Sequence, residues 1–513
     1  MLVPILIGIF FIIIRYNENF NEINISNLMF VVLIILPIIG LFSIIMRVII
    51  KDNLKSTLIS SLLLITFFVF IPIHDSLFEE EIGKYDSVGY LILFPIILIP
   101  LSIITYSILK SKKNFEKIIK IGVVVILSLV IFNISEIGLL ASTNYSIADN
   151  SSETFSIYQN IARDVYHIIP DERASTTILK ENYDYDNLDF VNYLQNEGFF
   201  IPKTSFSNYN STSLSLPSIL NMDYVHYKIG SEKAGDLVFD KIMENNSVVK
   251  NFENIGYEVV YFDNEYNLAP TSKSTNMLCG SNATNLRIIF FFIDNTPIVI
   301  FKNNLFELID SNENEELKKI SSTNPMVENR LCIFDELVSL DEKYSEPIFV
   351  HAHIILPHGP FLFDANGNVI GDSRESLTGV TSSVYWNNWT SLYLDQLEYT
   401  DSKIQEVVKK LLTKEPQPII IIQSDHGLRD LSDKSLIRVN DFSNFSAYYF
   451  PEVELNDDEY PIITSVNSFR ILFNTYFGTD YELLENKMYI QNETKYEDIT
   501  DIIISKDTIQ KQK

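Results

Sequence analysis

The first third of the chain consists of long apolar stretches separated by short polar gaps. The last four stretches hold roughly 20 residues each, enough for an α-helix to cross a bilayer, whereas the first is short for a span. The first stretch also lacks the charged start and the small-residue cleavage site of a secretory signal. The pattern therefore predicts five transmembrane helices within a membrane region of residues 1–141, at 1–14, 28–46, 56–73, 89–109 and 118–141.

The hydrophobic pattern changes after residue 141. The segment 142–160 is polar and rich in turn-forming residues, which indicates a linker. From 161 to 505, short apolar runs alternate with helical periodicity, which predicts an α/β/α layered domain with a mostly parallel central sheet, and 506–513 form a polar tail. A helix is expected from Leu392 to Leu412, and strands are expected at Val165–Pro170, Glu258–Phe262, Ile348–Leu356 and Ile419–Gln423.

Charge in the gaps predicts how the chain crosses the membrane. Arg47, Lys51 and Lys55 follow the second apolar stretch, lysines crowd the segment 110–120 after the fourth, and the loop at 75–86 between the third and fourth is acidic. Positively charged loops remain in the cytoplasm. We therefore expect a multi-pass cell-membrane protein whose large domain lies outside the cytoplasm.

Composition excludes one class of partner. The net charge of −27 and pI of about 4.6 leave no basic surface with which to neutralise phosphates, so no nucleic-acid partner is expected. The two cysteines, Cys279 and Cys332, fit no metal-finger spacing and could form one disulfide if the domain lies outside the cell.

Candidate chemistry begins where two predicted strands end. Four isoleucines at 419–422 read as a buried parallel strand, and Asp425 and His426 follow at its carboxyl end, where open α/β sheets bind ligands. The domain's first strand likewise delivers Asp171 and Glu172. Carboxylate oxygens beside an imidazole suit a divalent metal, with zinc favoured over manganese. Simple capping of the following helices is the alternative.

Two further segments could converge on this edge. The hydroxyl-rich run 207–215 precedes a helix whose first turn is expected to contain Pro217, which places Thr212 at or just before a helix N-terminus that favours an alkoxide and a phosphate. An ordinary capped loop is the alternative. Three of the seven histidines lie close together, with His351 and His353 on one strand face and His358 in the following turn. Of these three histidines, His351 is the one that we would most readily assign a structural role.

These motifs in this order resemble the alkaline phosphatase superfamily, in its sulfatase-like hydrolase/transferase branch. The membrane-bound members that the chain resembles are phosphoethanolamine transferases and lipoteichoic acid synthases. The resemblance spans the outer domain and implies an alkaline phosphatase-like fold. The segments that carry it are I-I-P-D-E at 168–172, T-S-L-S-L-P at 212–217, H-A-H-I-I-L-P-H-G-P at 351–360, Y-L-D-Q-L-E-Y-T-D at 393–401, S-D-H-G at 424–427, F-S-N-F-S-A-Y-Y-F-P at 442–451 and V-N-S-F-R at 466–470.

Transferred residue by residue, the resemblance implies a nucleophile at Thr212, with His353 and His358 facing the transferred group. The metal ligands that it implies are Asp171, Thr212, Asp425 and His426. The transferases usually have Glu at the position of Asp171, so the choice between Asp171 and Glu172 stays open, with strand phase favouring Asp171.

The chain departs from the patterns of related families at two positions, and each departure restricts the reactions that the site could perform. Ile354 stands where two-metal relatives have an acid, which argues against a second permanent metal, and no Cys/Ser-x-Pro-x-Arg element surrounds Thr212 for the formylglycine of true sulfatases.

The resulting prediction is a membrane-anchored, metal-dependent transferase that moves a phosphoryl-linked head group from a phospholipid-type donor to a surface glycan or lipid of the cell envelope. The reaction would pass through a phospho-threonine intermediate. A phosphodiesterase or phosphatase that uses water at the same site is the first alternative. A non-catalytic surface protein of the same fold is the second.

Overall fold

The computed structural model describes most of the chain and separates it into two compact units, one helical and N-terminal, the other an α/β domain. Most of the predicted linker lies outside the described residues. The described residues are 2–18, 25–82, 87–143, 163–226, 242–243, 246–262, 275–279, 296–298, 325–340, 343–344, 347–370, 388–429, 439–491 and 495–510.

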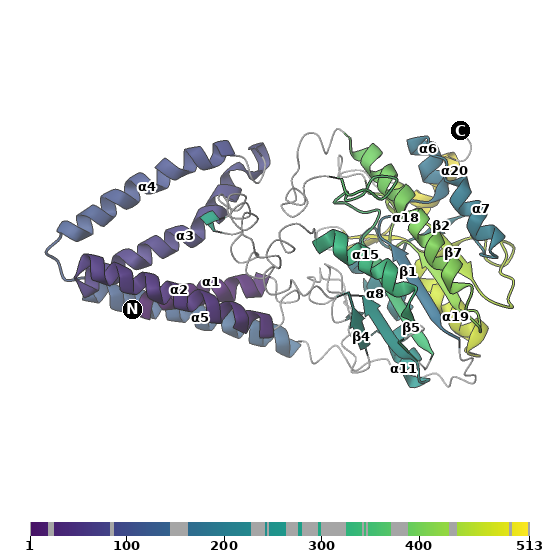
Figure 1. The fold of residues 1–513 in the computed structure, drawn as a ribbon, viewed down its shortest axis with the longest axis horizontal. Coiled ribbons are helices and arrows are strands. Elements are labelled where there is room, and N and C mark those ends of the chain that lie inside the picture. Colours follow the sequence, from purple (N-terminus) through teal and green to yellow (C-terminus); the bar gives the residue numbers. More distant parts are fainter. Residues whose placement is uncertain are drawn as a thin grey trace, which may run out of the picture. The chain divides into compact units, whose positions relative to one another are not determined.

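Among the described residues, the helical unit contains five apolar helices in the positions that the hydropathy pattern predicts (Figure 1). Four of them are long and apolar enough to cross a membrane, and the shorter first helix packs against the second, third and fifth. Many of their apolar side chains, such as Leu33, Ile99 and Phe132, are exposed, as a lipid-facing surface requires. The helices are α1 (Leu2–Glu18), α2 (Ile25–Ile50), α3 (Asn53–Ile82), α4 (Ser87–Lys110) and α5 (Glu116–Thr143).

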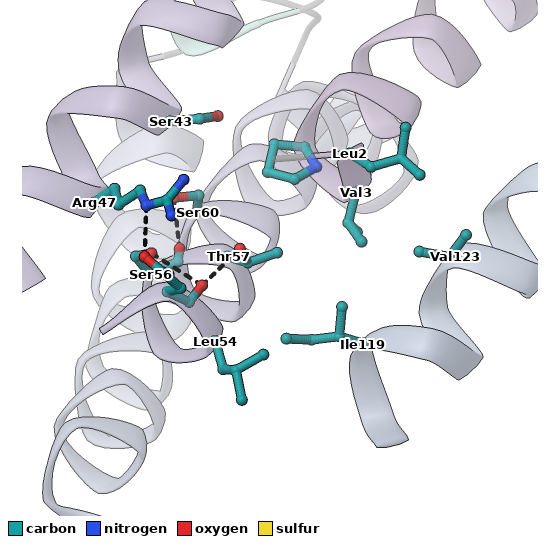
Figure 2. Close-up of a pocket in the computed structure, with 12 residues that line it drawn as sticks. Leu2, Val3, Ser43, Arg47, Leu54, Ser56, Thr57, Ser60, Ile119 and Val123 are labelled. Atoms are coloured by element: carbon teal, nitrogen blue, oxygen red, sulfur yellow. Dashed lines mark hydrogen bonds between the residues drawn. The ribbon is translucent and has the colours of Figure 1, made fainter. Parts of the chain in front are cut away.

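A cavity of about 280 Å³ lies among the ends of α1, α2, α3 and α5 (Figure 2). Polar groups that line the cavity form hydrogen bonds with residues of the helices themselves. Ser60 Oγ donates to the Ser56 carbonyl at 2.7 Å, and Arg47 Nε donates to Asn53 Oδ1. These residues belong to the Lys/Arg-rich end of the helical unit, and none of them is among the predicted site residues.

The α/β domain is built on a six-stranded sheet in the order β4-β3-β5-β1-β6-β7. All neighbouring strands are parallel except β6 and β7, which are antiparallel, so the mostly parallel sheet is confirmed. Three of the four predicted strands have the expected bounds, and β5 ends two residues early. The strands are β1 (Val165–Pro170), β3 (Glu258–Phe262), β4 (Thr275–Leu278), β5 (Ile348–Ile354), β6 (Ile419–Gln423) and β7 (Ser446–Tyr449).

Helices cover both faces of this sheet, which gives the predicted α/β/α layers (Figure 1). On one face, α7 (Leu188–Asn196), α15 (Pro325–Leu337) and α18 (Trp389–Leu411) pack on the even-numbered residues of β1 and β6. On the other, α8 (Thr212–Asn221), α11 (Ser247–Asn254) and α19 (Ser468–Tyr476) pack on the odd-numbered ones. Because alternate strand residues point to opposite faces, Asp171 and Asp425 continue the register that faces α8.

Smaller elements complete the domain. Two short pairs, β2 with β8 and β9 with β10, lie outside the main sheet, and the final helix continues into the predicted polar tail as far as residue 510. A disulfide joins Cys279 to Cys332 with 5.7 Å between their Cα atoms. The elements are α6 (Thr176–Tyr183), α20 (Thr500–Gln510), β2 (Ser205–Phe206), β8 (Ile463–Thr464), β9 (Tyr489–Gln491), β10 (Tyr496–Asp498) and the 3-10 turns η3 (Val439–Asp441) and η4 (Ser465–Asn467).

The expected position of Pro217 in the first turn of its helix is wrong. Helix α8 starts at Thr212, after Ser211 in an extended conformation, so Pro217 lies in the second turn. There its missing N–H costs the hydrogen bond to the carbonyl of Ser213, one turn earlier. The start of the helix is determined instead by Ser211, whose carbonyl accepts from the N–H groups of Leu214 and Ser215.

Candidate metal centre

The carboxyl edge of the sheet brings two predicted ligands together. Residues Val165 of β1 and Ile419 of β6 are register partners, and each lies six positions before an aspartate, Asp171 and Asp425. On the other side of β1, Ile169 is the register partner of His353. The parallel register therefore places two carboxylates and an imidazole at neighbouring strand ends, all fully or almost fully buried.

The side chains at this edge form a compact cluster. Ligand atoms of Asp171, His353 and Asp425 all lie within 4.8 Å of one another. His353 Nε2 is 3.2 Å from Asp171 Oδ2, and His426 Nε2 is 3.4 Å from Asp425 Oδ2 and 3.8 Å from Asp171 Oδ1. Asp171 thus has an imidazole nitrogen of both His353 and His426 within 3.8 Å.

Thr212 completes the cluster from the N-terminus of α8. Its Oγ1 donates a 2.7 Å hydrogen bond to Asp425 Oδ2 and lies 3.4 Å from His426 Nε2. Free N–H groups in the first turn of α8 and the positive end of the helix dipole favour negative charge at this oxygen. The sequence expectation for Thr212, at the start of a helix and beside Asp425, matches this geometry.

The cluster fits a divalent metal ion. Both oxygens of Asp171 are buried and face the imidazole nitrogens of His353 and His426, and burying a carboxylate is costly unless a positive group compensates it. The Nδ1 atom of His426 lies 2.8 Å from the carbonyl of its neighbour Gly427, so the Nδ1–H donates to that carbonyl and Nε2 faces the cluster. Burial raises the pKa of Asp171, but the facing His358, His353 and His426 outweigh it and lower that pKa overall. Asp171 is therefore anionic and could serve as a ligand for a cation.

Glu172, the alternative to Asp171 as ligand, points elsewhere. Its Oε1 accepts from the backbone N and the Nε of Arg429 at 3.0 and 3.3 Å, and its Oε2 lies 3.6 Å from His358 Nε2. Burial lowers the pKa of His358, yet the carboxylates of Asp171 and Glu172 raise it overall, with Arg429 opposing them. Arg429 thus places a positive charge beside His358 at the rim of the buried cluster, and sequence analysis missed the arginine.

Helix α18 holds the loops that present these groups. Tyr393 Oη donates to the Glu172 carbonyl at 3.0 Å, and Gln396 Nε2 donates to the carbonyls of Pro357 and His358, both at 3.0 Å. One turn further, Asp401 receives two 2.8 Å hydrogen bonds from the buried Arg173. All three α18 residues occur in the motif Y-L-D-Q-L-E-Y-T-D, which sequence analysis quoted only as part of a resemblance.

Gly427 is required because another backbone segment approaches it closely. A Cβ at this position would come within 1.9 Å of the backbone oxygen of Asn440 and 2.9 Å of that of Ser443. Its N–H also donates to the carbonyl of Asp441 at 3.0 Å. Close approach of this backbone, which follows His426 directly, excludes any side chain at Gly427.

His351 lies outside the cluster, as expected of a structural histidine. Its Nδ1 is 3.1 Å from His167 Nδ1, its ring stacks on Tyr261, and both histidines are fully buried. Burial, and to a smaller extent the charge of His353, lowers the pKa of His167 to about 3. Burial also holds the pKa of His351 well below its usual value. Both are therefore neutral core residues.

Comparison with known families agrees with this architecture. The sulfatase family matches residues 173–437, more than half of the 513-residue chain. The chain belongs to the sulfatase family. Its fold is accordingly that of the alkaline phosphatase superfamily, as the resemblance implied. No protein with a curated description matches the chain significantly.

Several solved structures are similar at low identity. The periplasmic domain of Escherichia coli EptC in complex with zinc is 11% identical, with a TM-score of 0.44, over 70% of this chain and 98% of that one. The soluble domain of Neisseria meningitidis lipooligosaccharide phosphoethanolamine transferase A is 12% identical, with a TM-score of 0.37, over 62% and 90%. The 2-O GAG sulfatase BT1596 is 11% identical, with a TM-score of 0.41, over 66% and 79%. The chemistry of this chain therefore has to be argued from its own residues.

Proposed function

We propose that this sulfatase-family member is a membrane-anchored transferase. It would move a phosphoryl-linked head group from a phospholipid-type donor to an envelope glycan or lipid through a phospho-threonine intermediate. The observation that supports this most directly is the contact between Thr212 Oγ1 and the buried cluster of Asp425, His426 and Asp171. A hydroxyl in this position is suited to nucleophilic attack rather than to a purely structural role.

A metal ion would be held by Asp171, Asp425, His426 and Thr212, and His353 Nε2 lies close enough to Asp171 to join them. When bound, a zinc or manganese ion would stabilise negative charge on the Thr212 oxygen and on the non-bridging oxygens of the donor. Ligands of this type suit zinc first, because two imidazole nitrogens accompany the carboxylates.

In the first half-reaction, Thr212 Oγ1 attacks the donor phosphorus and its proton passes to Asp425 Oδ2, which already accepts its hydrogen bond. The bond between phosphorus and the lipid oxygen breaks, and His358 gives a proton to the leaving alcohol. The raised pKa of His358 favours the protonated form that this step needs. The phosphoryl-linked group then resides on Thr212.

The second half-reaction reverses the first with another alcohol. The acceptor hydroxyl gives its proton to His358 and attacks phosphorus, the bond to Thr212 breaks, and Asp425 returns the proton to Oγ1. Water in place of the acceptor alcohol would convert the same site into a phosphodiesterase or phosphatase.

Three features of the chain support a site on the outer side of a membrane. Four helices are long and apolar enough to span it. Their cationic ends, at Arg47–Lys55 and Lys110–Lys120, favour a cytoplasmic position for those loops. The disulfide between Cys279 and Cys332 is typical of domains outside the cytoplasm. A donor lipid and an anchored enzyme would then share one surface.

The test is incubation of the metal-loaded full chain with phospholipid labelled in the head group, with and without candidate glycan or lipid acceptors. Transfer of label to an acceptor supports the proposal. Release of labelled head group at the same rate with every acceptor would support the hydrolase. Absence of both, together with failure of the purified protein to bind metal, would support a non-catalytic protein of this fold.

A further inference from the structure

Arg429 lies at the rim of the candidate metal cluster. Its backbone N and its Nε both donate to Glu172 Oε1, at 3.0 and 3.3 Å, and its Nη2 lies 3.3 Å from His358 Nε2. The Arg429 side chain is 29% exposed and that of His358 is 21% exposed, whereas that of Glu172 is 8% exposed. A fixed guanidinium therefore opens toward solvent beside a buried cluster.

Electrostatics explains why a cation is needed there. Asp171, Asp425 and Glu172 place three carboxylates in the site, within a chain of net charge −27. An anionic substrate would meet repulsion from all three unless positive groups lie on its approach. Arg429 retains its charge at every physiological pH. Burial lowers its pKa, but the carboxylates of Glu172, Asp171 and Asp425 raise it overall.

The local backbone is strained in a way that holds this guanidinium in place. Glu172 adopts a φ of 60°, a left-handed conformation that is unfavourable for a non-glycine residue. In this conformation its N–H donates to Asp425 Oδ1 at 3.1 Å while its carboxylate engages Arg429. One residue thus links the guanidinium to the aspartate that orients Thr212.

Arg429 Nη2 lies 3.3 Å from His358 Nε2, within reach of a hydrogen bond, so the guanidinium and the imidazole share the rim of the cluster. Glu172 accepts from the backbone N–H and the Nε of Arg429 and fixes the position of the guanidinium. Because the Arg429 side chain is 29% exposed, a substrate that arrives from the solvent can reach it.

We propose that Arg429 is a substrate-binding residue that donates hydrogen bonds to a non-bridging oxygen of the phosphoryl group being transferred, with Glu172 as its positioning residue. The planar guanidinium suits a phosphodiester, whose two non-bridging oxygens can be shared between Arg429 and the cation site. This inference rests on the proposed function, because it names the group that recognises the donor.

The test uses inorganic phosphate as the probe and the metal-loaded full chain in detergent, so that binding is measured without turnover. Arg429→Gln should weaken phosphate binding at least tenfold, and Arg429→Lys should restore part of it because the charge remains. Arg163→Gln is the matched control, since Arg163 precedes β1 at the opposite edge of the sheet and bonds to Gln417 and Glu452. It removes the same charge and should leave binding unchanged.

Kinetics separates substrate binding from a structural role. With a labelled phosphodiester, Arg429→Gln should raise KM strongly, and the wild-type KM should rise with salt more steeply than that of the variant. Glu172→Gln should raise KM less, because its Oε1 still accepts from Arg429.

If the wild type binds phosphate and Arg429→Gln binds it equally well, this inference fails while the proposed function stands. If the wild type binds phosphate, Arg429→Gln does not bind it, and the wild type transfers no head group, the anion site stands and the proposed function fails. If the metal-loaded wild type binds no phosphate, both fail.

Discussion

Thr212 Oγ1 donates a 2.7 Å hydrogen bond to Asp425 Oδ2 although 213 positions separate the two residues in the chain. Helix α8 begins at one of them and strand β6 ends just before the other. The bond joins a helix N-terminus to a sheet edge and aims the hydroxyl proton at a buried carboxylate. This relationship makes Thr212 the candidate nucleophile among several neighbouring hydroxyl groups.

The first prediction concerns that hydroxyl group. Thr212→Ala should abolish turnover yet cost only about 1–2 kcal/mol of folding free energy, because one hydrogen bond to a charged acceptor is lost. Thr212→Ser should retain part of the activity, since the attacking oxygen survives and only the methyl that restricts its rotamer is removed. Steady-state rates and thermal unfolding would be measured together.

The matched control is Ser213→Ala, one residue along the same helix, which should remain active. Ser215→Ala should also keep activity but lose some stability, because Ser215 Oγ donates to the Tyr209 carbonyl at 2.9 Å. Full turnover by Thr212→Ala would rule out the covalent mechanism and favour direct attack by water.

The second prediction concerns metal content. Purified full-length protein should hold about one tightly bound zinc or manganese ion per chain, because the cluster has the ligand types of a single site. Asp425→Asn combined with His426→Ala should lose that ion, as should Asp171→Asn. Asp457→Asn is the control and should retain the ion, because Asp457 accepts a hydrogen bond from the backbone N–H of Lys203 and is not a predicted ligand. Elemental analysis that found stoichiometric metal in the double variant would place the site elsewhere.

The third prediction is a pH dependence that arises from the buried pair of His167 and His351. The pKa of His167 is about 3 in the folded chain, against about 6.5 when unfolded, so below pH 6.5 the unfolded chain binds a proton that the folded chain does not. The free energy of unfolding should therefore fall as pH falls, by about 2 kcal/mol between pH 6.5 and 5 for this residue.

His167→Phe should flatten that pH dependence, whatever its effect on absolute stability. Denaturant unfolding can be followed by tryptophan fluorescence in the full chain, because Trp386 and Trp389 are its two tryptophans and both follow the helical unit in the chain. Equal slopes of stability against pH in the variant and the wild type would contradict this prediction.

Much of the site could be predicted from sequence because parallel strands end at one edge. Asp171 and Asp425 each follow a continuous apolar run whose strand identity is unambiguous, and Ile169 and His353 become register partners once those strands are parallel. The position of Thr212 could be predicted from a helix start next to a hydroxyl-rich loop. The choice between Asp171 and Glu172 followed strand phase, and the structure directs Glu172 toward Arg429.

The rest depended on contacts that no periodicity signals. Arg429 lies beyond the strand and the glycine, and its direction depends on the left-handed backbone of Glu172. The edge strands β4 and β7 have only four residues each, too few to show alternation. Pro217 lies in the second turn because α8 starts at Thr212, directly after Ser211, and the preference of proline for the first turn alone misplaced that start.

The fourth prediction concerns topology and uses paired cysteine variants. Lys113→Cys places a thiol between α4 and α5, and Lys409→Cys places one on an exposed position of α18. The native cysteines are joined in a disulfide and should not react. A membrane-impermeant maleimide added to intact cells should label Lys409→Cys, and should label Lys113→Cys only after lysis. The reverse pattern would overturn the outward orientation of the α/β domain and any chemistry on outer-leaflet lipids.

The most direct test of the central claim is mass spectrometry of the protein trapped with a phospholipid donor and no acceptor. The account predicts that the added phosphoryl-linked mass lies on the peptide containing Thr212 and is located on Thr212 itself by fragmentation. Thr212→Ala should carry no such adduct under the same conditions, and Ser213→Ala should carry it fully. An adduct on Ser211, on Ser213 or on a histidine, or donor turnover by the wild type with no adduct at any time, would contradict the account.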